Sequence, residues 1–183
     1  MLLPYLKNVF GRHQCIVRPN NTGNAPKSFH NLSSRTITGE HFHFSQLKGK
    51  KVLIVNTASQ CSYTDQYSIL ESFQQMYQQS LVILGFPCND FFRQEPESEA
   101  KIQQFCRSNY DISFPMFEKS STIGSHKSPV YKWLSEKSQN GWNHRAPQWN
   151  FCKYLVDENG ELLLYATSAI LPTHKDFISL VEH

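Results

Sequence analysis

Several signals that would define a class of protein are missing from this sequence. No apolar stretch is long enough to cross a lipid bilayer, and the short apolar run at the start is interrupted by Pro4 and Lys7. The 18 basic and 15 acidic residues give a formal net charge of +3, without a basic patch or stripe. These absences predict a protein with no secretory signal, no stable membrane insertion and no binding of nucleic acid.

Acidic residues are absent from the N-terminal part of the chain, where none precedes Glu40. Basic residues do occur there: Lys7, Arg12, Arg18, Lys27 and Arg35. An acid-free, basic leader is typical of organelle transit peptides, whereas a polar extension of the same composition can also lack any targeting role. We predict a flexible N-terminal extension over residues 1–27, one domain over residues 28–183 and a cytoplasmic location, with organelle targeting as the alternative.

The cysteines form no Cys-x-x-Cys pair and no spacing typical of a zinc site. There are five of them: Cys15, Cys61, Cys88, Cys106 and Cys152. An odd number without a secretory signal favours free thiols in a reducing compartment. His41 and His43 alternate along a predicted strand, but no third ligand is near them in the sequence, so we predict no metal and no bound cofactor.

Two apolar runs, residues 51–57 and 81–86, predict strands that are buried on both faces. Apolar residues at helical spacing predict a helix between them, which begins near Thr64 or Asp65. In such a β-α-β unit the two strands are parallel neighbours joined by a right-handed crossover. A second helix is predicted after Pro96.

The remaining segments complete the pattern. Residues 128–137 predict a third helix, and Thr173 is placed to cap a last one. Residues 151–156 and 162–167 flank the turn sequence Asp-Glu-Asn-Gly, which predicts a hairpin. This order of elements predicts an α/β protein with a thioredoxin-like fold, in which helices flank a central mixed β-sheet.

Cys61 falls between the end of a predicted buried strand and the start of a predicted helix. The N-terminus of a helix offers unpaired N–H donors and partial positive charge, which favour a thiolate over a thiol. Since the thiolate is the nucleophilic form, the position suits an attacking cysteine. A small buried apolar cysteine is the alternative interpretation of the same position.

Four short segments decide between these interpretations. They are Asn-Thr-Ala-Ser-Gln-Cys ending at Cys61, Gly-Phe-Pro-Cys-Asn ending at Asn89, Gln-Glu-Pro beginning at Gln94 and Trp-Asn-Phe beginning at Trp149. In this order and at these distances they resemble the signature blocks of the glutathione peroxidase family, and the resemblance extends from about Ser28 to near the C-terminus. It implies that Cys61 is the peroxidatic cysteine and that Gln94, Trp149 and Asn150 complete the catalytic set.

The implied residues have side chains that suit the reaction. A thiolate that attacks a peroxide displaces an alkoxide or water, so negative charge develops on the departing oxygen. The amides of Gln94 and Asn150 and the indole N–H of Trp149 are neutral donors that can hold the thiolate and orient the peroxide oxygens. In isolation, Trp149 would be interpreted as a core aromatic and Gln94 as a loop residue or helix cap.

The chain departs from the family pattern at several positions near these blocks. Ser62 follows the cysteine where the family usually has glycine, Asp90 stands where glutamine is common, and Phe92 replaces a glycine. Cys152 occupies a position where threonine is common. None of these is an implied catalytic residue, but a bulky Phe92 beside the site affects the geometry of its loop and the access of substrate.

Once Cys61 is oxidised to a sulfenic acid, it must be reduced by an external thiol or by a second cysteine of the chain. Cys106 falls at the resolving position of family members that form an internal disulfide and are recycled by thioredoxin. It also shares an apolar helix face with its neighbours, so a buried core thiol is the alternative. Cys88 is the second candidate for resolution, although packing within its loop is favoured, and Cys15 and Cys152 are interpreted as bystanders.

We therefore predict an enzyme that reduces hydrogen peroxide and organic or lipid hydroperoxides, with thioredoxin or glutathione as its reducing co-substrate. The competing hypothesis is a redox sensor or relay, in which Cys61 passes its disulfide to a partner protein. The segment between Phe117 and Trp149 is short compared with family members that form tetramers. The resemblance therefore implies a monomer with an open site.

Overall fold

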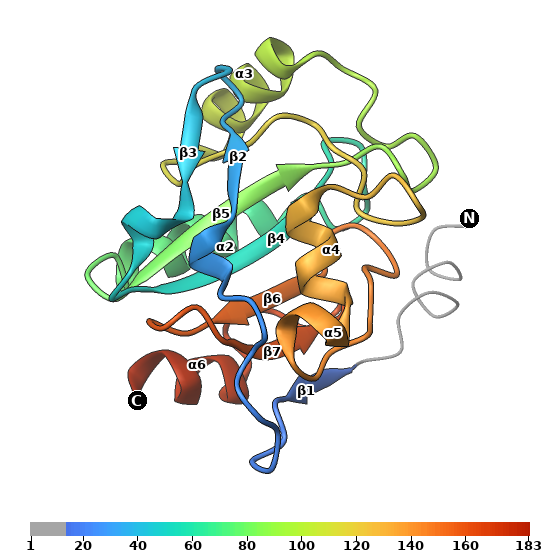
Figure 1. Cartoon of the computed structure of the whole chain (residues 1–183). Coiled ribbons are helices and arrows are strands. Elements are labelled where there is room, and N and C mark those ends of the chain that lie inside the picture. Colours follow the sequence, from blue (N-terminus) through green and yellow to red (C-terminus); the bar gives the residue numbers. More distant parts are fainter. Residues whose placement is uncertain (1–13) are drawn as a thin grey trace.

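The computed structural model describes residues 14–183 (Figure 1). Its strands are β1 (Cys15–Val17), β2 (Ser33–Arg35), β3 (His41–His43), β4 (Lys51–Thr57), β5 (Leu81–Pro87), β6 (Lys153–Val156) and β7 (Leu162–Ala166). Its α-helices are α2 (Gln66–Met76), α3 (Glu99–Tyr110), α4 (Pro129–Ser135), α5 (Lys137–Asn140) and α6 (Lys175–Glu182). Two short 3-10 helices are η1 (Phe29–Asn31) and η2 (Phe44–Leu47).

Five strands form the central sheet in the order β1-β7-β6-β4-β5, and β2 and β3 form a separate two-stranded sheet. β4 is parallel to β5 and antiparallel to β6, and β7 is antiparallel to both β6 and β1. The parallel pair is joined through α2, as the predicted β-α-β unit requires. The predicted α/β fold with a central mixed sheet and flanking helices is confirmed (Figure 1).

Alternation along β4 divides the apolar core between the two faces of the sheet. Leu53 and Val55 belong to the cluster that α2, α3 and α6 cover, whereas Val52 and Ile54 belong to a second cluster with η1, η2 and α4. All of these side chains are fully buried. A strand buried on both faces is what the continuous apolar run over residues 51–57 predicts.

The predicted hairpin joins β6 and β7 in antiparallel register, with Leu155 opposite Leu164. Gly160 closes the turn with a φ of +86° and donates its N–H to the carbonyl oxygen of Asp157 at 3.1 Å. A side chain at this position would have an unfavourable backbone conformation and would also collide with the hydroxyl of Ser28. The turn therefore requires glycine.

The structure differs from the sequence-based prediction in the N-terminal segment. Residues 15–17 fall within the predicted flexible extension, yet they form β1 and pair with β7, with Cys15 opposite Ala166. An edge strand this short has no periodicity in sequence from which it could be recognised. Residues 1–13 of the predicted extension lie outside the described residues.

Helix boundaries follow the sequence signals, with small differences. Asp65 is the N-cap of α2, which agrees with the predicted start, and the predicted third helix is divided into α4 and α5 at Glu136. His174, and not Thr173, is the N-cap of α6, because its Nδ1 accepts the N–H of Asp176. Within residues 14–183, no helix combines the length and the apolar character needed to span a membrane.

Candidate active site

Three loops meet at the edge of the sheet where β4 and β5 end and β6 begins. Cys61 follows β4, Gln94 follows β5, and Trp149 and Asn150 precede β6. Because β6 is antiparallel to β4, the start of β6 lies beside the end of β4. The carboxyl ends of parallel strands are a frequent place for functional sites in α/β proteins.

Cys61 is held by turns that lead from β4 toward α2. Its backbone N–H donates to Oγ1 of Thr64 at 3.0 Å, and the same hydroxyl donates to the carbonyl oxygen of Ala58 at 2.9 Å. The backbone N–H of Tyr63 donates to the sulfur of Cys61 at 3.5 Å. Cys61 is 9% exposed, so a fixed and nearly buried thiol keeps a small area at the surface.

Asn150 connects Cys61 to the other predicted site residues. Its side chain and that of Trp149 lie close enough to the thiol of Cys61 to lower the pKa of this thiol. Nδ2 of Asn150 also donates to Oε1 of Gln94 at 2.9 Å. The structure therefore brings Cys61, Trp149 and Asn150 together, and Gln94 joins them through Asn150.

Cys88 fixes the orientation of the Asn150 amide. Its thiol donates to Oδ1 of Asn150 at 3.4 Å and accepts a hydrogen bond from Nδ2 of Asn56 at 3.5 Å. With Oδ1 facing a donor, the two N–H groups of the amide are directed to Gln94 and Cys61. The sequence predicts a loop-packing or resolving role for Cys88, which is fully buried, and its pattern does not reveal this contact.

Asn56, near the end of β4, ties the segment from Trp149 to Cys152 to the sheet. Its Nδ2 donates to the carbonyl oxygen of Trp149 at 2.9 Å, and its Oδ1 accepts the N–H of Cys152 at 3.0 Å. Between them, Phe151 has a φ of +64°, which is unusual for an aromatic residue. Its N–H donates to the carbonyl oxygen of Asn56 at 2.6 Å, so the strained turn is held from both sides. The motif contains Asn56, but its pattern did not reveal this role.

Burial raises the pKa of the Cys61 thiol above its ordinary value. The N–H of Tyr63 and the side chains of Asn150, Trp149 and Ser62 lower the pKa in part, but burial is the larger effect. The prediction that this position favours the thiolate is therefore wrong in its net result. The physical reason is burial, which opposes the charged thiolate more strongly than these neighbours favour it.

The loop that carries Gln94 is strained beside it. Phe92 and Arg93 have φ values of +52° and +53°, in the left-handed region that favours glycine. The backbone N–H of Gln60 donates to the carbonyl oxygen of Gln94 at 3.0 Å and so joins this loop to the one that holds Cys61. Phe92 is 74% exposed, and its ring centroid lies 5.4 Å from that of Trp149. The residue that departs from the family pattern therefore forms an exposed aromatic surface at the site.

Glu95, the residue that follows Gln94, has a fully buried carboxyl group. Its Oε2 accepts a hydrogen bond from the hydroxyl of Ser59 at 3.1 Å, while its Oε1 has no hydrogen-bond partner among residues 14–183. Lys119 donates its Nζ to the backbone carbonyl oxygen of Glu95 at 3.2 Å. Burial raises the pKa of Glu95 to about 7, so this carboxyl group changes its charge near neutral pH.

Cys106 lies on α3, which buries only this residue and Ile102. Burial raises the pKa of the Cys106 thiol to about 11, and the neighbouring side chain of Tyr67 lowers it in part. Cys61 and Cys106 belong to the same apolar cluster, and both are free thiols. In the described structure both members of the pair are therefore in the reduced state.

A mixed sheet of this topology, with a nearly buried cysteine among amide and indole donors, defines a thiol-dependent redox protein with a thioredoxin-like fold. The family model for glutathione peroxidase matches residues 29–135. The chain therefore belongs to the glutathione peroxidase family. The predicted family and its peroxidase class are confirmed, although the match ends before Trp149 and Asn150.

Individual relatives agree with this assignment. The "Glutathione peroxidase-like peroxiredoxin 2" of Saccharomyces cerevisiae is 43% identical over 150 residues, which cover 81% of this chain and 93% of the relative. The "Glutathione peroxidase homolog BsaA" of Bacillus subtilis is 44% identical over 137 residues, which cover 74% of this chain and 86% of the relative.

Solved structures support the same fold. The crystal structure of Trgpx in its apo form is 30% identical, with a TM-score of 0.66, and the match covers 87% of this chain and 98% of the other. A DsbF homologue from Corynebacterium diphtheriae has a TM-score of 0.65 at 14% identity over 94% of each chain. That second likeness shows the fold alone.

Proposed function

We propose that this chain reduces hydrogen peroxide and organic hydroperoxides in a cycle in which Cys61 attacks and Cys106 resolves. The observation that carries the attacking step is the contact of the Cys61 sulfur with the donors of Asn150 and Trp149. Gln94 extends this set of donors through its 2.9 Å hydrogen bond with Asn150. Several relatives are named glutathione peroxidase-like peroxiredoxins, which supports a cycle that uses cysteine.

In the first step, the thiolate of Cys61 attacks one oxygen of the hydroperoxide. An S–O bond forms, and the O–O bond breaks with both electrons on the departing oxygen, which takes up a proton and leaves as water or an alcohol. The N–H donors of Asn150 and Trp149 stabilise the thiolate before the attack and the negative oxygen during it. Since burial opposes ionisation of Cys61, these donors are needed to supply the reactive form.

In the second step, the thiolate of Cys106 attacks the sulfur of the Cys61 sulfenic acid. An S–S bond forms, and the sulfenic oxygen leaves as water after it takes up a proton. A disulfide needs the two Cα atoms within about 7 Å, and we propose that a local opening of α3 brings the two cysteines together. The helix buries two of its 12 residues and borders a cavity of about 300 Å³. A segment with few buried contacts opens at a modest free-energy cost.

A dithiol of the thioredoxin type then reduces the disulfide through a mixed disulfide and returns both cysteines to thiols. We favour thioredoxin over glutathione because a resolving cysteine within the chain makes an intramolecular disulfide the species that must be reduced. Glutathione remains the alternative reductant. The monomeric state and the cytoplasmic location remain predictions from the sequence.

The proposal is tested by peroxide turnover with each reductant. Wild-type protein with thioredoxin, thioredoxin reductase and peroxide should consume NADPH steadily, and Cys61→Ser should abolish consumption. Cys106→Ser should use one equivalent of peroxide and then stop, whereas Cys15→Ser, in which a thiol outside the site is replaced, should behave as wild type. One equivalent followed by arrest in the wild type would indicate a relay, and full thioredoxin-linked turnover by Cys106→Ser would contradict its resolving role.

A further inference from the structure

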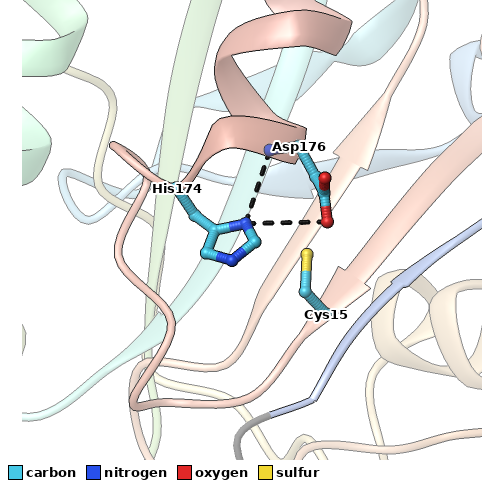
Figure 2. A group of neighbouring side chains, drawn as sticks. All are labelled: Cys15, His174 and Asp176. Carbon is cyan, nitrogen blue, oxygen red and sulfur yellow. Dashed lines mark hydrogen bonds and ion pairs between the residues drawn. The ribbon is translucent and has the colours of Figure 1, made fainter.

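Cys15, His174 and Asp176 bring three different metal-binding groups together at the side of the molecule formed by β1 and α6 (Figure 2). The ligand atoms of the three residues all lie within 4.8 Å of one another. Nδ1 of His174 is 3.6 Å from Oδ2 of Asp176. Two ligands at about 2.1 Å from a tetrahedral metal lie about 3.4 Å apart, so this spacing needs little adjustment to hold a metal ion.

The three side chains extend from regular secondary structure, the strand β1 and the helix α6. β1 is fixed to the sheet by pairing with β7, and the backbone N–H of Thr167 donates to the carbonyl oxygen of Gln14 at 2.9 Å, directly beside Cys15. His174 is the N-cap of α6, and Asp176 lies in its first turn. The N–H of Asp176 donates to Nδ1 of His174 at 3.4 Å, so this ring nitrogen carries no proton, and its lone pair binds a metal once this long hydrogen bond is given up. Capping of the helix accounts for His174 and Asp176 but not for the thiol that faces them.

We propose that Cys15, His174 and Asp176 form a zinc-binding site, with solvent at the fourth coordination position. A thiolate, an imidazole and a carboxylate are the ligand types of zinc, whereas magnesium and calcium prefer oxygen ligands alone. The side chains of His174 and Asp176 are each 34% exposed, which leaves a route for the ion and room for a water ligand. Three protein ligands with one open position are the usual number in zinc sites that are not closed by a fourth side chain.

The carboxylate of Asp176 brings negative charge to within 4.8 Å of the other two ligand atoms, which favours a cation at this position. Zinc binding releases the proton of the Cys15 thiol as the S–Zn bond forms. The ion then ties the edge strand β1 to α6, at a place separate from the residues of the peroxide site. Because the unfolded chain does not hold the three ligands together, zinc stabilises the folded protein.

The experiment titrates zinc into reduced, chelator-treated protein and follows binding by calorimetry. Cobalt serves as a second probe because a thiolate ligand produces a charge-transfer absorption. Wild type and Cys61→Ser should each bind one ion, which separates this site from the peroxidatic thiol. Cys15→Ser, His174→Gln and Asp176→Asn should each lose at least about tenfold in affinity. The exposed His126 supplies the matched control, and His126→Gln should bind as wild type.

Thermal unfolding gives an independent readout. Zinc at about 100 times its dissociation constant should raise the melting temperature of the wild type by about 5 °C or more, and the shift should vanish in Cys15→Ser. The melting temperature of each variant is compared with and without zinc, so any effect of the substitution itself on stability cancels. The proposal is overturned if Cys15→Ser binds zinc as tightly as the wild type, or if the wild type binds none in molar excess. Peroxide consumption by Cys15→Ser should be unchanged in either case.

Discussion

Glu95→Gln tests whether burial raises the pKa of the carboxyl group that follows Gln94. Glutamine has nearly the same shape and keeps an oxygen that can accept the hydroxyl of Ser59, which lies 3.1 Å from Oε2. The substitution removes only the ability to lose a proton. Glu95 is fully buried and its Oε1 has no hydrogen-bond partner among residues 14–183, so the cost of burial exceeds the stabilisation of the ionised form by Ser59 and Lys119.

The size of the effect follows from the pKa of Glu95, which burial raises from 4.5 to about 7. The folded protein therefore binds this proton more tightly than the unfolded chain does. The stabilisation is fully present below pH 4.5 and is lost as the pH rises to about 7. At about 1.4 kcal/mol for each unit of pKa difference, the loss is about 3 kcal/mol, to order of magnitude.

Urea unfolding of wild type and Glu95→Gln at pH 5 and pH 8 measures this loss. The two proteins should have nearly equal free energies of unfolding at pH 5, and at pH 8 the variant should be more stable by about 2 to 3 kcal/mol. The other titrating groups are common to both proteins and cancel in the difference. Glu40→Gln, which changes an exposed carboxylate, should show no such trend. A difference between wild type and Glu95→Gln that stays constant from pH 5 to pH 8 would refute the reasoning.

Three further predictions concern the donors and the loop around Cys61. Asn150→Ala should slow the oxidation of Cys61 by about 10²–10³ in single-turnover measurements, and Gln94→Ala should slow it less, because it acts through Asn150; equal rates in both variants and wild type would exclude the donor roles. Cys88→Ala should slow the same step without removing a group from the sulfur, and Cys88→Ser should restore part of the rate by donating to Oδ1 of Asn150; no rescue by serine would exclude the positioning role. Phe92→Gly should raise KM for large apolar hydroperoxides more than for hydrogen peroxide, because it removes an exposed ring beside the site; an equal change for both substrates would count against a role in substrate contact.

The sequence was most informative where one local pattern determines one feature. The apolar run over residues 51–57 predicts a strand buried on both faces, and the alternation of Leu53 and Ile54 between two clusters confirms it. The position of Cys61 after this strand, and of Asn150 before another, follows from motif order. The contact between them then depends on the antiparallel register of β4 and β6.

Features that depend on distant contacts could not be predicted in this way. The pKa of Cys61 depends on how deeply tertiary packing buries it, and sequence position alone suggested the opposite direction. The contact of Cys88 with Asn150 joins two blocks whose order was recognised but whose mutual orientation is not encoded in spacing. Cys15 approaches His174 only because β1 pairs with β7, and a three-residue edge strand leaves no periodic signal.

The buried charge of Glu95 also links the attacking and resolving halves of the proposed cycle. Burial raises the pKa of the Cys106 thiol, and the carboxylate of Glu95 adds to this effect. The side chain of Glu95 also accepts a hydrogen bond from Ser59, in the loop that leads to Cys61. If α3 opens together with the segment before it, Glu95 and Cys106 are both hydrated, so ionisation of Glu95 above about pH 7 favours the open state. Disulfide formation after sulfenic acid should therefore accelerate more steeply with pH in wild type than in Glu95→Gln. Stopped-flow fluorescence measures the rate of the resolving step at pH 6 and at pH 8 in wild type and in Glu95→Gln. If the ratio of the rate at pH 8 to the rate at pH 6 is the same in both proteins, Glu95 does not bias the opening of α3.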